Sequence, residues 1–243
     1  MKAVFTNRRD AGQKLAQQLT AYTNNPDTIV LALPRGGVPV AYEVAEKLNL
    51  PLDVCLVRKI GLPNSSETAM GAIAEDALLP NYSSYITIID RDMTKSYGVK
   101  QSEIQAISLT TWLRYAAREK AEIRWRETCY RHYRPMLPIS DRTVIIVDDG
   151  MATGLTMQAA VRAISTHQPM EIIVAIPVAS WQAIAKLAEG IAKLEYQVDD
   201  LICLETPKAM GAVGFSYEDF TQVSDREVCD LLSEKSMRLV GRA

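Results

Sequence analysis

Histidine is scarce in this sequence: the 243 residues include only His132 and His167. Metal sites and catalytic triads that depend on histidine are therefore nearly excluded. Cysteine is also sparse, and no two cysteines form a C-x-x-C pair. This spacing favours buried free thiols over a disulfide framework or a zinc knuckle. The four cysteines are Cys55, Cys129, Cys203 and Cys229.

Neither sign of charge dominates, because 27 basic residues stand against 29 acidic ones and leave a net charge of −2. Proteins that bind nucleic acid through its phosphates usually carry a basic excess, so the charge gives nucleic acid little support as a partner. No apolar run approaches the roughly 18 residues of a membrane span. The stretch from Met1 to Arg9 lacks the apolar core of a secretory signal. We expect a cytoplasmic globular protein with no membrane partner.

The two most familiar phosphate-binding loops are absent too: there is no G-x-x-x-x-G-K-[ST] sequence, and no G-x-G-x-x-G follows a predicted strand. A different phosphate candidate lies between Thr143 and Thr156. Its first part, Val144 to Val147, consists of four β-branched apolar residues, which is typical of a strand buried on both faces of a parallel sheet. Asp148 and Asp149 follow at the carboxyl end. Because burying two carboxylates is costly, we expect them to face a crevice.

The residues after the acids suit a phosphate. Glycines let the backbone approach a ligand closely, and free N–H groups that enter a helix form an anion site. Thr153 and Thr156 add hydroxyl donors. The acid pair would instead accept hydrogen bonds from adjacent hydroxyls, such as those of a ribose. Together they indicate a sugar phosphate, although a strand, an acidic turn and a helix start are each ordinary features of α/β proteins.

The stretch from Val144 to Thr156 closely resembles the signature of type I phosphoribosyltransferases. In that family the acids hold the ribose hydroxyls of 5-phosphoribosyl-1-pyrophosphate (PRPP), and the loop holds its 5′-phosphate. The resemblance therefore assigns the ribose to Asp148 and Asp149. It assigns the rest of this PRPP-binding stretch to Gly150, Met151, Ala152, Thr153, Gly154, Leu155 and Thr156.

A second candidate turn, Pro34 to Gly37, joins a predicted buried strand, Thr28 to Leu33, to an amphipathic helix. It offers another set of N–H groups with an arginine beside them. A short Arg-Gly-Gly sequence is by itself also an ordinary turn. Upstream of the ribose-phosphate stretch, it resembles the family's pyrophosphate loop, formed here by Arg35, Gly36 and Gly37. By the same resemblance we expect the Arg35–Gly36 peptide to be cis.

Arg58 and Lys59 follow a third predicted strand, Leu52 to Val57, at the edge where a parallel sheet presents its ligand crevice. A basic pair at a strand end commonly faces solvent. Lys59, however, resembles family positions that contact pyrophosphate. The resemblance therefore implies four catalytic residues: Arg35, Lys59, Asp148 and Asp149.

The stretch from Gly61 to Asp76 is rich in Gly, Pro, Asn and Ser, which favours a loop, with a short strand near Gly71 to Ala74 as an option. The family closes a mobile lid over the reacting centre from this region. Glu67 and Glu75 could enter the site, but surface exposure is the favoured interpretation of both.

A long helical segment, Lys100 to His132, exceeds the family's common core. Its arginines could bind an acidic partner or a phosphate, but arginine and glutamate interleaved at helical spacing favour a solvated face. Three later strands are predicted, at Tyr85–Ile89, Ile172–Ile176 and Leu201–Leu204. Three later helices are predicted, at Leu155–Thr166, Trp181–Lys193 and Ser224–Ser236. Ser180 and Ser224 are expected to cap the last two helices.

Alternation of buried strands and helices predicts an α/β fold: a parallel sheet flanked by helices on both faces. The resemblance makes this a single type I phosphoribosyltransferase-like domain over residues 1–243. A helical insertion at about 91–135 and a small hood at about 205–223 complete the expected layout.

The resemblance implies a pentosyltransferase of nucleotide metabolism that moves the phosphoribosyl group from PRPP to a small nitrogenous acceptor and releases pyrophosphate. Mg²⁺ is expected as cofactor, held mainly by PRPP and water with no direct protein ligand. Enzymes for 6-oxopurines carry an aspartate just before the loop threonine, where this chain has Ala152. Hypoxanthine and guanine are therefore disfavoured.

Two other functions stay open at this level. One is a regulatory protein that senses PRPP or a nucleotide on the same fold without catalysis, and the other is an adaptor whose basic helix holds RNA. A pyrophosphate loop favours an enzyme over a sensor of monophosphates. The sequence also leaves a homodimer open.

Overall fold

The computed structural model describes residues 3–62, 65–76, 84–89, 109–132, 134–193 and 196–240. Its centre is a five-stranded sheet in the order β2-β1-β6-β7-β8, in which every neighbouring pair is parallel. The predicted fold class is confirmed. The strands are β1 (Thr28–Ala32), β2 (Leu52–Val54), β6 (Thr143–Val147), β7 (Glu171–Val178) and β8 (Asp200–Glu205).

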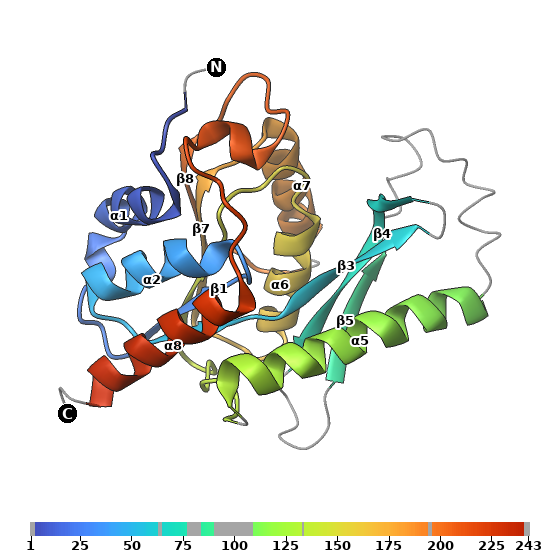
Figure 1. Cartoon of the computed structure of the whole chain (residues 1–243), viewed down its shortest axis with the longest axis horizontal. Helices are drawn as coiled ribbons and strands as arrows, with labels where there is room; N and C mark the ends of the chain where they lie inside the picture. The colour runs from blue at the N-terminus through green and yellow to red at the C-terminus, as the bar shows by residue number, and fades with distance from the viewer. Residues whose placement is uncertain are drawn as a thin grey trace.

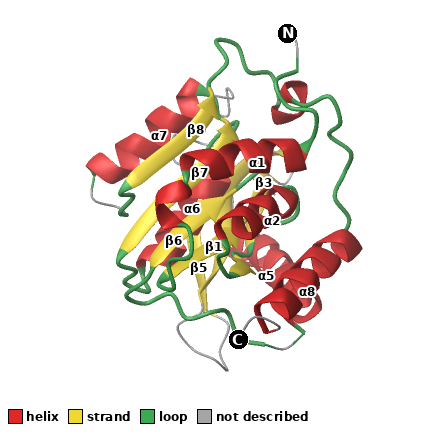
Figure 2. Ribbon diagram, turned by 90° about the vertical axis from the view of Figure 1, so that its left-hand side faces the viewer, coloured by secondary structure: helices red, strands yellow, loops and turns green. Residues whose placement is uncertain are grey.

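Helices cover both faces of this sheet, as Figures 1 and 2 show. Alternate strand residues point to opposite faces, so Val30 and Ile145 join one core while Ile29 and Ile146 join the other. The first core packs against α1 (Arg8–Gln18), α2 (Gly37–Leu48) and α8 (Asp225–Val240). The second packs against α6 (Leu155–Ser165) and α7 (Trp181–Ala192).

Both predicted helix caps are confirmed. The Ser180 hydroxyl accepts a hydrogen bond from the Ala183 N–H at 3.0 Å, and Ser224 accepts one from the Glu227 N–H at 3.1 Å. Each serine satisfies a donor that the first turn of its helix leaves open. These two starts were readable because capping depends on residues that are close in sequence.

A second, antiparallel sheet lies beside the first and contains β3 (Val57–Leu62), β4 (Ser65–Asp76) and β5 (Ser84–Ile89). It corrects two predictions. The strand predicted at Leu52–Val57 ends at Val54, and Lys59 lies within β3 rather than after the end of a main-sheet strand. The segment predicted as a lid loop is mostly the long strand β4. Pairing with β3 and β5 supplies its backbone hydrogen bonds, and local composition gives no sign of that pairing.

The helix α5 (Leu109–Arg131) lies along the second sheet (Figure 1). Residues 100–108 of the predicted helix lie outside the described residues. The prediction of a solvated face is wrong for Arg126, which is 8% exposed, and for Arg131, which is 3% exposed. Other arginines of the helix, including Arg118 and Arg124, are exposed as predicted.

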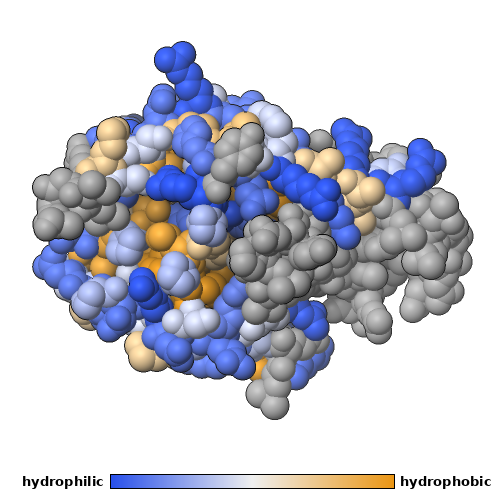
Figure 3. Space-filling model, turned by 90° about the horizontal axis from the view of Figure 1, so that it is seen from below, coloured by the Kyte–Doolittle hydropathy of each residue, from blue (hydrophilic) through white to orange (hydrophobic). Residues whose placement is uncertain are grey.

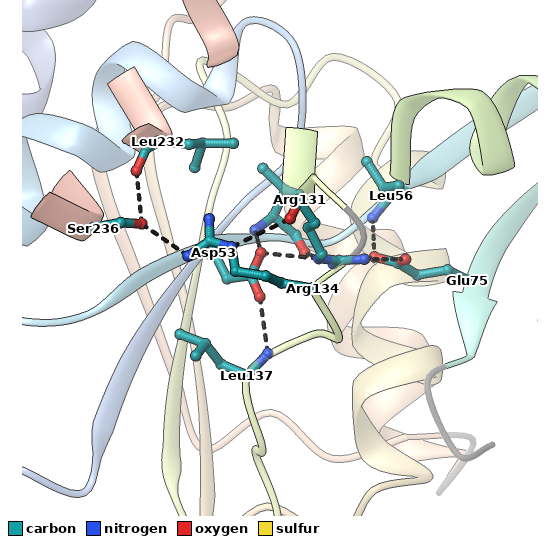
Figure 4. Close-up of polar contacts among 9 residues, drawn as sticks. Asp53, Leu56, Glu75, Arg131, Arg134, Leu137, Leu232 and Ser236 are labelled. Carbon is teal, nitrogen blue, oxygen red and sulfur yellow. Dashed lines mark hydrogen bonds and ion pairs between the residues drawn. The ribbon is translucent and has the colours of Figure 1, made fainter. Parts of the chain in front are cut away.

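Arg131 anchors the end of α5 to both sheets (Figure 4). Its Nε lies 3.0 Å from Asp53 of β2, and its two terminal nitrogens each lie 2.8 Å from an oxygen of Glu75 of β4. Glu75 also accepts from the Leu56 N–H, and Asp53 accepts from the Leu137 N–H. Glu75 is therefore buried, contrary to the expected exposure, whereas the Glu67 side chain lies outside the described part of the structure.

The segment between β8 and α8 contains the short helix η2 (Val213–Ser216) and lies at the top of Figure 1. Its aromatic residues pack on the amino-terminal segment and on one another. The Tyr217 ring centroid lies 5.3 Å from that of Phe5, in the amino-terminal segment, and 5.0 Å from that of Phe220. Figure 3 shows the opposite, lower face, which is mostly hydrophilic with hydrophobic residues visible in its left half. Among the described helices, none is long and apolar enough to cross a membrane.

Candidate active site

The site lies where the strand order of the main sheet changes direction. From β1 the chain moves outward to β2, whereas β6 lies on the other side of β1, so the loops after β1 and β6 diverge from a shared crevice. Open α/β sheets bind ligands at this position, beyond the carboxyl ends of the strands. The two strands run in register from Thr28 beside Thr143 to Ala32 beside Val147. The two candidate loops are therefore neighbours in space.

A pocket of about 540 Å³ opens between these loops. It brings together most of the predicted site residues: Arg35, Gly36, Lys59, Asp148, Asp149, Gly150, Met151, Ala152, Thr153, Gly154 and Thr156. Two predicted residues do not line it. Gly37 lies beneath the acid pair at the start of α2, and the side chain of Leu155, the first residue of α6, is buried in the second core.

Glycine allows the loops to approach this closely. A Cβ atom on Gly36 would lie 2.0 Å from Oδ2 of Asp149, and one on Gly37 would lie 2.8 Å from the carbonyl oxygen of Val147. These distances are shorter than any tolerable contact, so even alanine would push the turn from Arg35 to Gly37 away from the acids. Glycine is needed here for space, a role that glycine has where backbones meet closely.

The cis peptide expected in this loop is present, but one bond earlier than predicted. The structure has it between Pro34 and Arg35, not between Arg35 and Gly36. The prediction carried over a family position by its distance from the first glycine, and that distance does not hold in this chain.

The loop after the acids presents free amide groups to the pocket. Gly154 adopts a left-handed conformation with φ of 78°, and α6 begins at the next residue. The N–H groups from Ala152 to Thr156 have no acceptor within the described structure. The Ser180 hydroxyl donates to the Ala152 carbonyl at 2.7 Å and thereby fixes the loop from α7. Such a set of amides at a helix start is suited to a phosphate.

The acid pair is electrostatically strained. Burial raises the pKa of Asp148 well above its ordinary value, and the neighbouring Asp149 carboxylate raises it further. Burial also raises the pKa of Asp149, although Arg8 opposes this by pairing with Oδ2 at 2.8 Å. The backbone N–H of Asp149 donates to Oδ1 of Asp148 at 2.8 Å, which holds the Asp148 carboxylate against the backbone of its neighbour. Hydroxyl donors from a ligand would stabilise the ionised forms.

Arg35 and Lys59 supply positive charge on another side of the pocket. One terminal nitrogen of Arg35 lies 3.2 Å from Asp225 of α8, and its other nitrogens have no acceptor among the described residues. Lys59 likewise has no hydrogen-bond acceptor in that set, although its positive charge favours the ionised form of Asp148 by lowering the pKa of that carboxyl. Free cationic donors on one wall and free amides on another could each hold an anionic group.

Arg8 is the main site residue that the sequence reasoning missed. It lies at the start of α1 and reaches Asp149, while a second nitrogen donates to the Thr221 carbonyl at 2.8 Å. Its guanidinium lies 3.8 Å from the centre of the Phe220 ring. No local pattern could have identified it, because its partner Asp149 is 141 residues away in sequence.

The sequence predicts the hood only as a small element at about 205–223, with no residue of it in the site. The Tyr217 hydroxyl donates to the Asp149 carbonyl oxygen at 2.5 Å, so the hood is attached directly to the acid pair. Val213, Phe220, Gln222 and Val223 complete the pocket on this side. Gly150 packs beneath Val213, where an added Cβ would lie 2.4 Å from a methyl carbon.

The donor set fits a metal that is carried by a substrate. In the described ranges no three Asp, Glu, His or Cys residues gather to bind an ion. Among the described residues that line the pocket, the only carboxylates are Asp148 and Asp149, and Asp149 already pairs with Arg8. Mg²⁺ retains several waters and commonly binds through substrate phosphates, so this sparse set suits it.

Comparison with known proteins agrees with the geometry. A family model, the phosphoribosyl transferase domain, matches residues 3–217. Two curated relatives from the CDC 1551 and H37Rv strains of Mycobacterium tuberculosis, provisionally named phosphoribosyl transferases, are 37% identical over 229 residues. These matches cover 94% of this chain and 46% of each relative, so the chain spans about half the length of the curated relatives it matches.

A solved structure shows the same fold. The crystal structure of a Thermus thermophilus protein is 36% identical, covers 95% of this chain and 98% of its own, and superposes with a TM-score of 0.69. Together with the family model, this likeness extends over both sheets and the pocket. The chain belongs to the phosphoribosyltransferase family.

Proposed function

We propose that this chain transfers the 5-phosphoribosyl group of PRPP to a small nitrogenous acceptor and releases pyrophosphate. One observation carries the proposal: a strained acid pair lies between a loop of free amides and two cations that have unused donors. PRPP has one chemical counterpart for each of these groups: a 5′-phosphate for the amides, a ribose for the acids and a pyrophosphate for the cations.

Each part of the donor has a chemical counterpart. The ribose hydroxyls would donate to Asp148 and Asp149, whose ionised forms are disfavoured by burial and would be stabilised by such donors. The 5′-phosphate would take the amides from Ala152 to Thr156 and the hydroxyls of Thr153 and Thr156. Arg35, Lys59 and the turn of Gly36 and Gly37 would contact the pyrophosphate.

The reaction breaks the bond between C1 of the ribose and the pyrophosphate oxygen, which leaves with the electron pair. A nitrogen lone pair of the acceptor forms the new bond, and that nitrogen then gives its proton to solvent water. Charge develops on the leaving oxygen as the bond lengthens, so the positive charges of Arg35 and Lys59 would stabilise the transition state more than the ground state. Bound Mg²⁺ would neutralise part of the pyrophosphate charge. The hood, attached through Tyr217, lines one side of the pocket and would shield that side of the reacting centre from water.

Ala152 narrows the range of nitrogenous bases that could serve as the acceptor. It lines the pocket where the 6-oxopurine enzymes have an aspartate that contacts the base, and its methyl group can neither accept nor donate a proton. We therefore infer an acceptor other than hypoxanthine or guanine. The same proposal includes the wider assignments. We propose a single domain over residues 1–243, with an insertion at 91–135 and a hood at 205–223. We also propose a homodimer and a cytoplasmic location.

The test is a pyrophosphate-release assay with PRPP, Mg²⁺ and a panel of nucleobases and small amines. Asp149→Asn should lose release, since an amide cannot replace the carboxylate toward both Arg8 and the ribose. Asp141→Asn is the matched control: Asp141 lies far from the pocket, and its left-handed conformation, with φ of 56°, also suits asparagine.

Three outcomes separate the alternatives. Release by the native protein and by Asp141→Asn, with loss in Asp149→Asn, supports the enzyme. Saturable binding of PRPP without release for any acceptor points instead to a PRPP-sensing regulator. Rapid turnover of hypoxanthine or guanine contradicts the inference drawn from Ala152.

A further inference from the structure

The arginine of the pyrophosphate loop is held from outside the loop. Arg35 lines the pocket, and its NH1 lies 3.2 Å from Oδ2 of Asp225, in the first turn of α8. The two residues are 190 positions apart, and their side chains are 28% and 32% exposed. Arg35 has no other partner among the described residues. Its remaining N–H donors are therefore available to a ligand while Asp225 fixes one edge of the guanidinium.

The other oxygen of Asp225 is also occupied. The Tyr130 hydroxyl, on α5, donates a short hydrogen bond to Oδ1. Burial and the neighbouring carboxylate raise the pKa of Tyr130, so the hydroxyl keeps its proton and acts as the donor. The Tyr130 side chain is 1% exposed and belongs to the core that packs α2, α5 and α8 together. Asp225 is thus fixed by a side chain that cannot easily move.

The helix that carries Tyr130 is itself anchored. The next residue, Arg131, makes the buried ion pairs with Asp53 and Glu75 that join α5 to the two sheets (Figure 4). A continuous set of contacts therefore runs from the sheets through Arg131 and Tyr130 to Asp225 and Arg35. Figure 1 shows the carboxyl-terminal end of α5 close to the start of α8, and the two helices are in contact.

We propose that Asp225 and Tyr130 are positioning residues that hold the Arg35 guanidinium in the orientation needed by the pyrophosphate group. The inference rests on the proposed function and deepens it, because it gives the helical insertion a role at the reacting centre. A free arginine side chain loses rotamer entropy when a ligand fixes it. Asp225 fixes Arg35 before the ligand arrives, so less of this cost falls on binding.

The carboxylate of Asp225 could have the opposite effect. A negative charge next to Arg35 repels the pyrophosphate and competes for the same guanidinium, which would weaken binding. The two effects differ in what they need from the side chain. Positioning needs an acceptor atom at the place of Oδ2, whereas repulsion needs only the charge. Asparagine keeps the acceptor and removes the charge, and alanine removes both.

The experiment compares Asp225→Asn, Asp225→Ala and Tyr130→Phe with the native protein. The measurements are KM for PRPP, kcat, and the binding of inorganic pyrophosphate and of ribose 5-phosphate by calorimetry. Asp230→Ala is the matched control. Asp230 is on the same helix and its side chain is 73% exposed, and its ion pair with the exposed Arg226 is long, at 3.8 Å.

Positioning predicts that Asp225→Ala raises KM for PRPP and Kd for pyrophosphate by about tenfold, the equivalent of one charged hydrogen bond. Asp225→Asn should stay within about threefold of the native protein, and Tyr130→Phe should fall between them. Ribose 5-phosphate, which lacks the pyrophosphate, should bind equally to all variants. Asp230→Ala should match the native protein.

Several results would overturn the inference. Tighter pyrophosphate binding in both Asp225→Asn and Asp225→Ala would show that repulsion dominates. Parallel loss of ribose 5-phosphate binding would show general damage to the site, and unchanged KM and Kd in Asp225→Ala would show no role. If Tyr130→Phe fails to fold, the two Asp225 variants still decide the matter. Failure of the native protein to bind PRPP at all would instead refute the proposed function.

Discussion

At the scale of single residues, Asp148 shows a conflict between stability and ligand binding. It lies at the end of a strand whose five residues are all buried, and its carboxylate faces a second carboxylate across one peptide bond. Burial and Asp149 both raise its pKa. The native state accordingly holds a proton on Asp148 more tightly than the unfolded chain does, and the ionised form reduces the stability of the native state.

Asp148→Asn should therefore stabilise the protein at pH 7, by about 1 kcal/mol, while abolishing transfer. An acid with a raised native pKa makes stability fall as the pH rises from its unfolded pKa to its native pKa, and asparagine does not titrate. The advantage of the variant should thus grow through that window and stay constant above it. Urea unfolding at several pH values measures this. The prediction would be contradicted if Asp148→Asn were less stable than the native protein at pH 7. It would also be contradicted if the gain in stability were as large at acid pH as at pH 7.

Gly36→Ala tests the close approach of the two loops. The added methyl would lie 2.0 Å from Oδ2 of Asp149, and Gly36 has ordinary helical angles, so the effect would come from space and not from backbone strain. We expect kcat/KM to fall by at least about a hundredfold, which is typical of a displacement near 1 Å in a site.

Gly211→Ala is the control for that change. Its methyl would lie 3.1 Å from the exposed Phe215 ring, which can move aside, and should leave kcat/KM within about twofold. Native-like kinetics in Gly36→Ala would show that the loops can separate without cost and that the acids do not need their present place.

At the scale of elements, α5 depends on its last residue. Arg131 is 3% exposed and pairs with Asp53 and Glu75, which are 7% and 9% exposed. Each of the three charges would be costly without the others, because the buried surroundings solvate them poorly. The network also explains how a helix from a segment outside the main sheet acquires a fixed position next to the site.

Arg131→Met should lower the free energy of unfolding by about 3 to 5 kcal/mol, because it leaves two buried carboxylates without a counter-charge. Denaturant unfolding gives this value. The control, Arg226→Met, removes an arginine that is 91% exposed and should change stability by less than about 0.5 kcal/mol. A small loss in Arg131→Met would mean that water reaches the carboxylates.

At the scale of the whole molecule, the pocket draws on segments from both ends of the chain. Arg8 comes from α1, Arg35 and Asp148 from loops of the central sheet, Lys59 from the second sheet, and Phe220 from the hood. An unfolded chain offers none of these groupings, so PRPP should bind only to the folded protein and stabilise it by mass action.

PRPP with Mg²⁺ at a hundred times its Kd should therefore add about 2.7 kcal/mol of stability. For a chain of this size that corresponds to a rise in Tm of roughly 5 to 10 °C. A thermal melt with and without PRPP measures the shift, and Asp149→Asn should show little of it. An equal shift in both proteins would place PRPP somewhere other than the acid pair.

Local sequence was sufficient for the parts of the fold that depend on neighbouring residues. Runs of β-branched residues such as Val144 to Val147 predicted buried parallel strands, because such residues suit a sheet covered on both faces. Ser180 and Ser224 marked helix starts. The acids and the glycine–threonine loop also indicated where a sugar phosphate could bind, since their chemistry is written in consecutive positions.

Only the tertiary structure decided the rest. The antiparallel sheet of β3, β4 and β5 depends on pairing partners that composition does not reveal. Arg8 reaches Asp149 across 141 residues, and Asp225 reaches Arg35 across 190. A sequence pattern specifies the local backbone and the burial of nearby side chains, whereas contacts between distant residues arise only when the packed core brings their elements together.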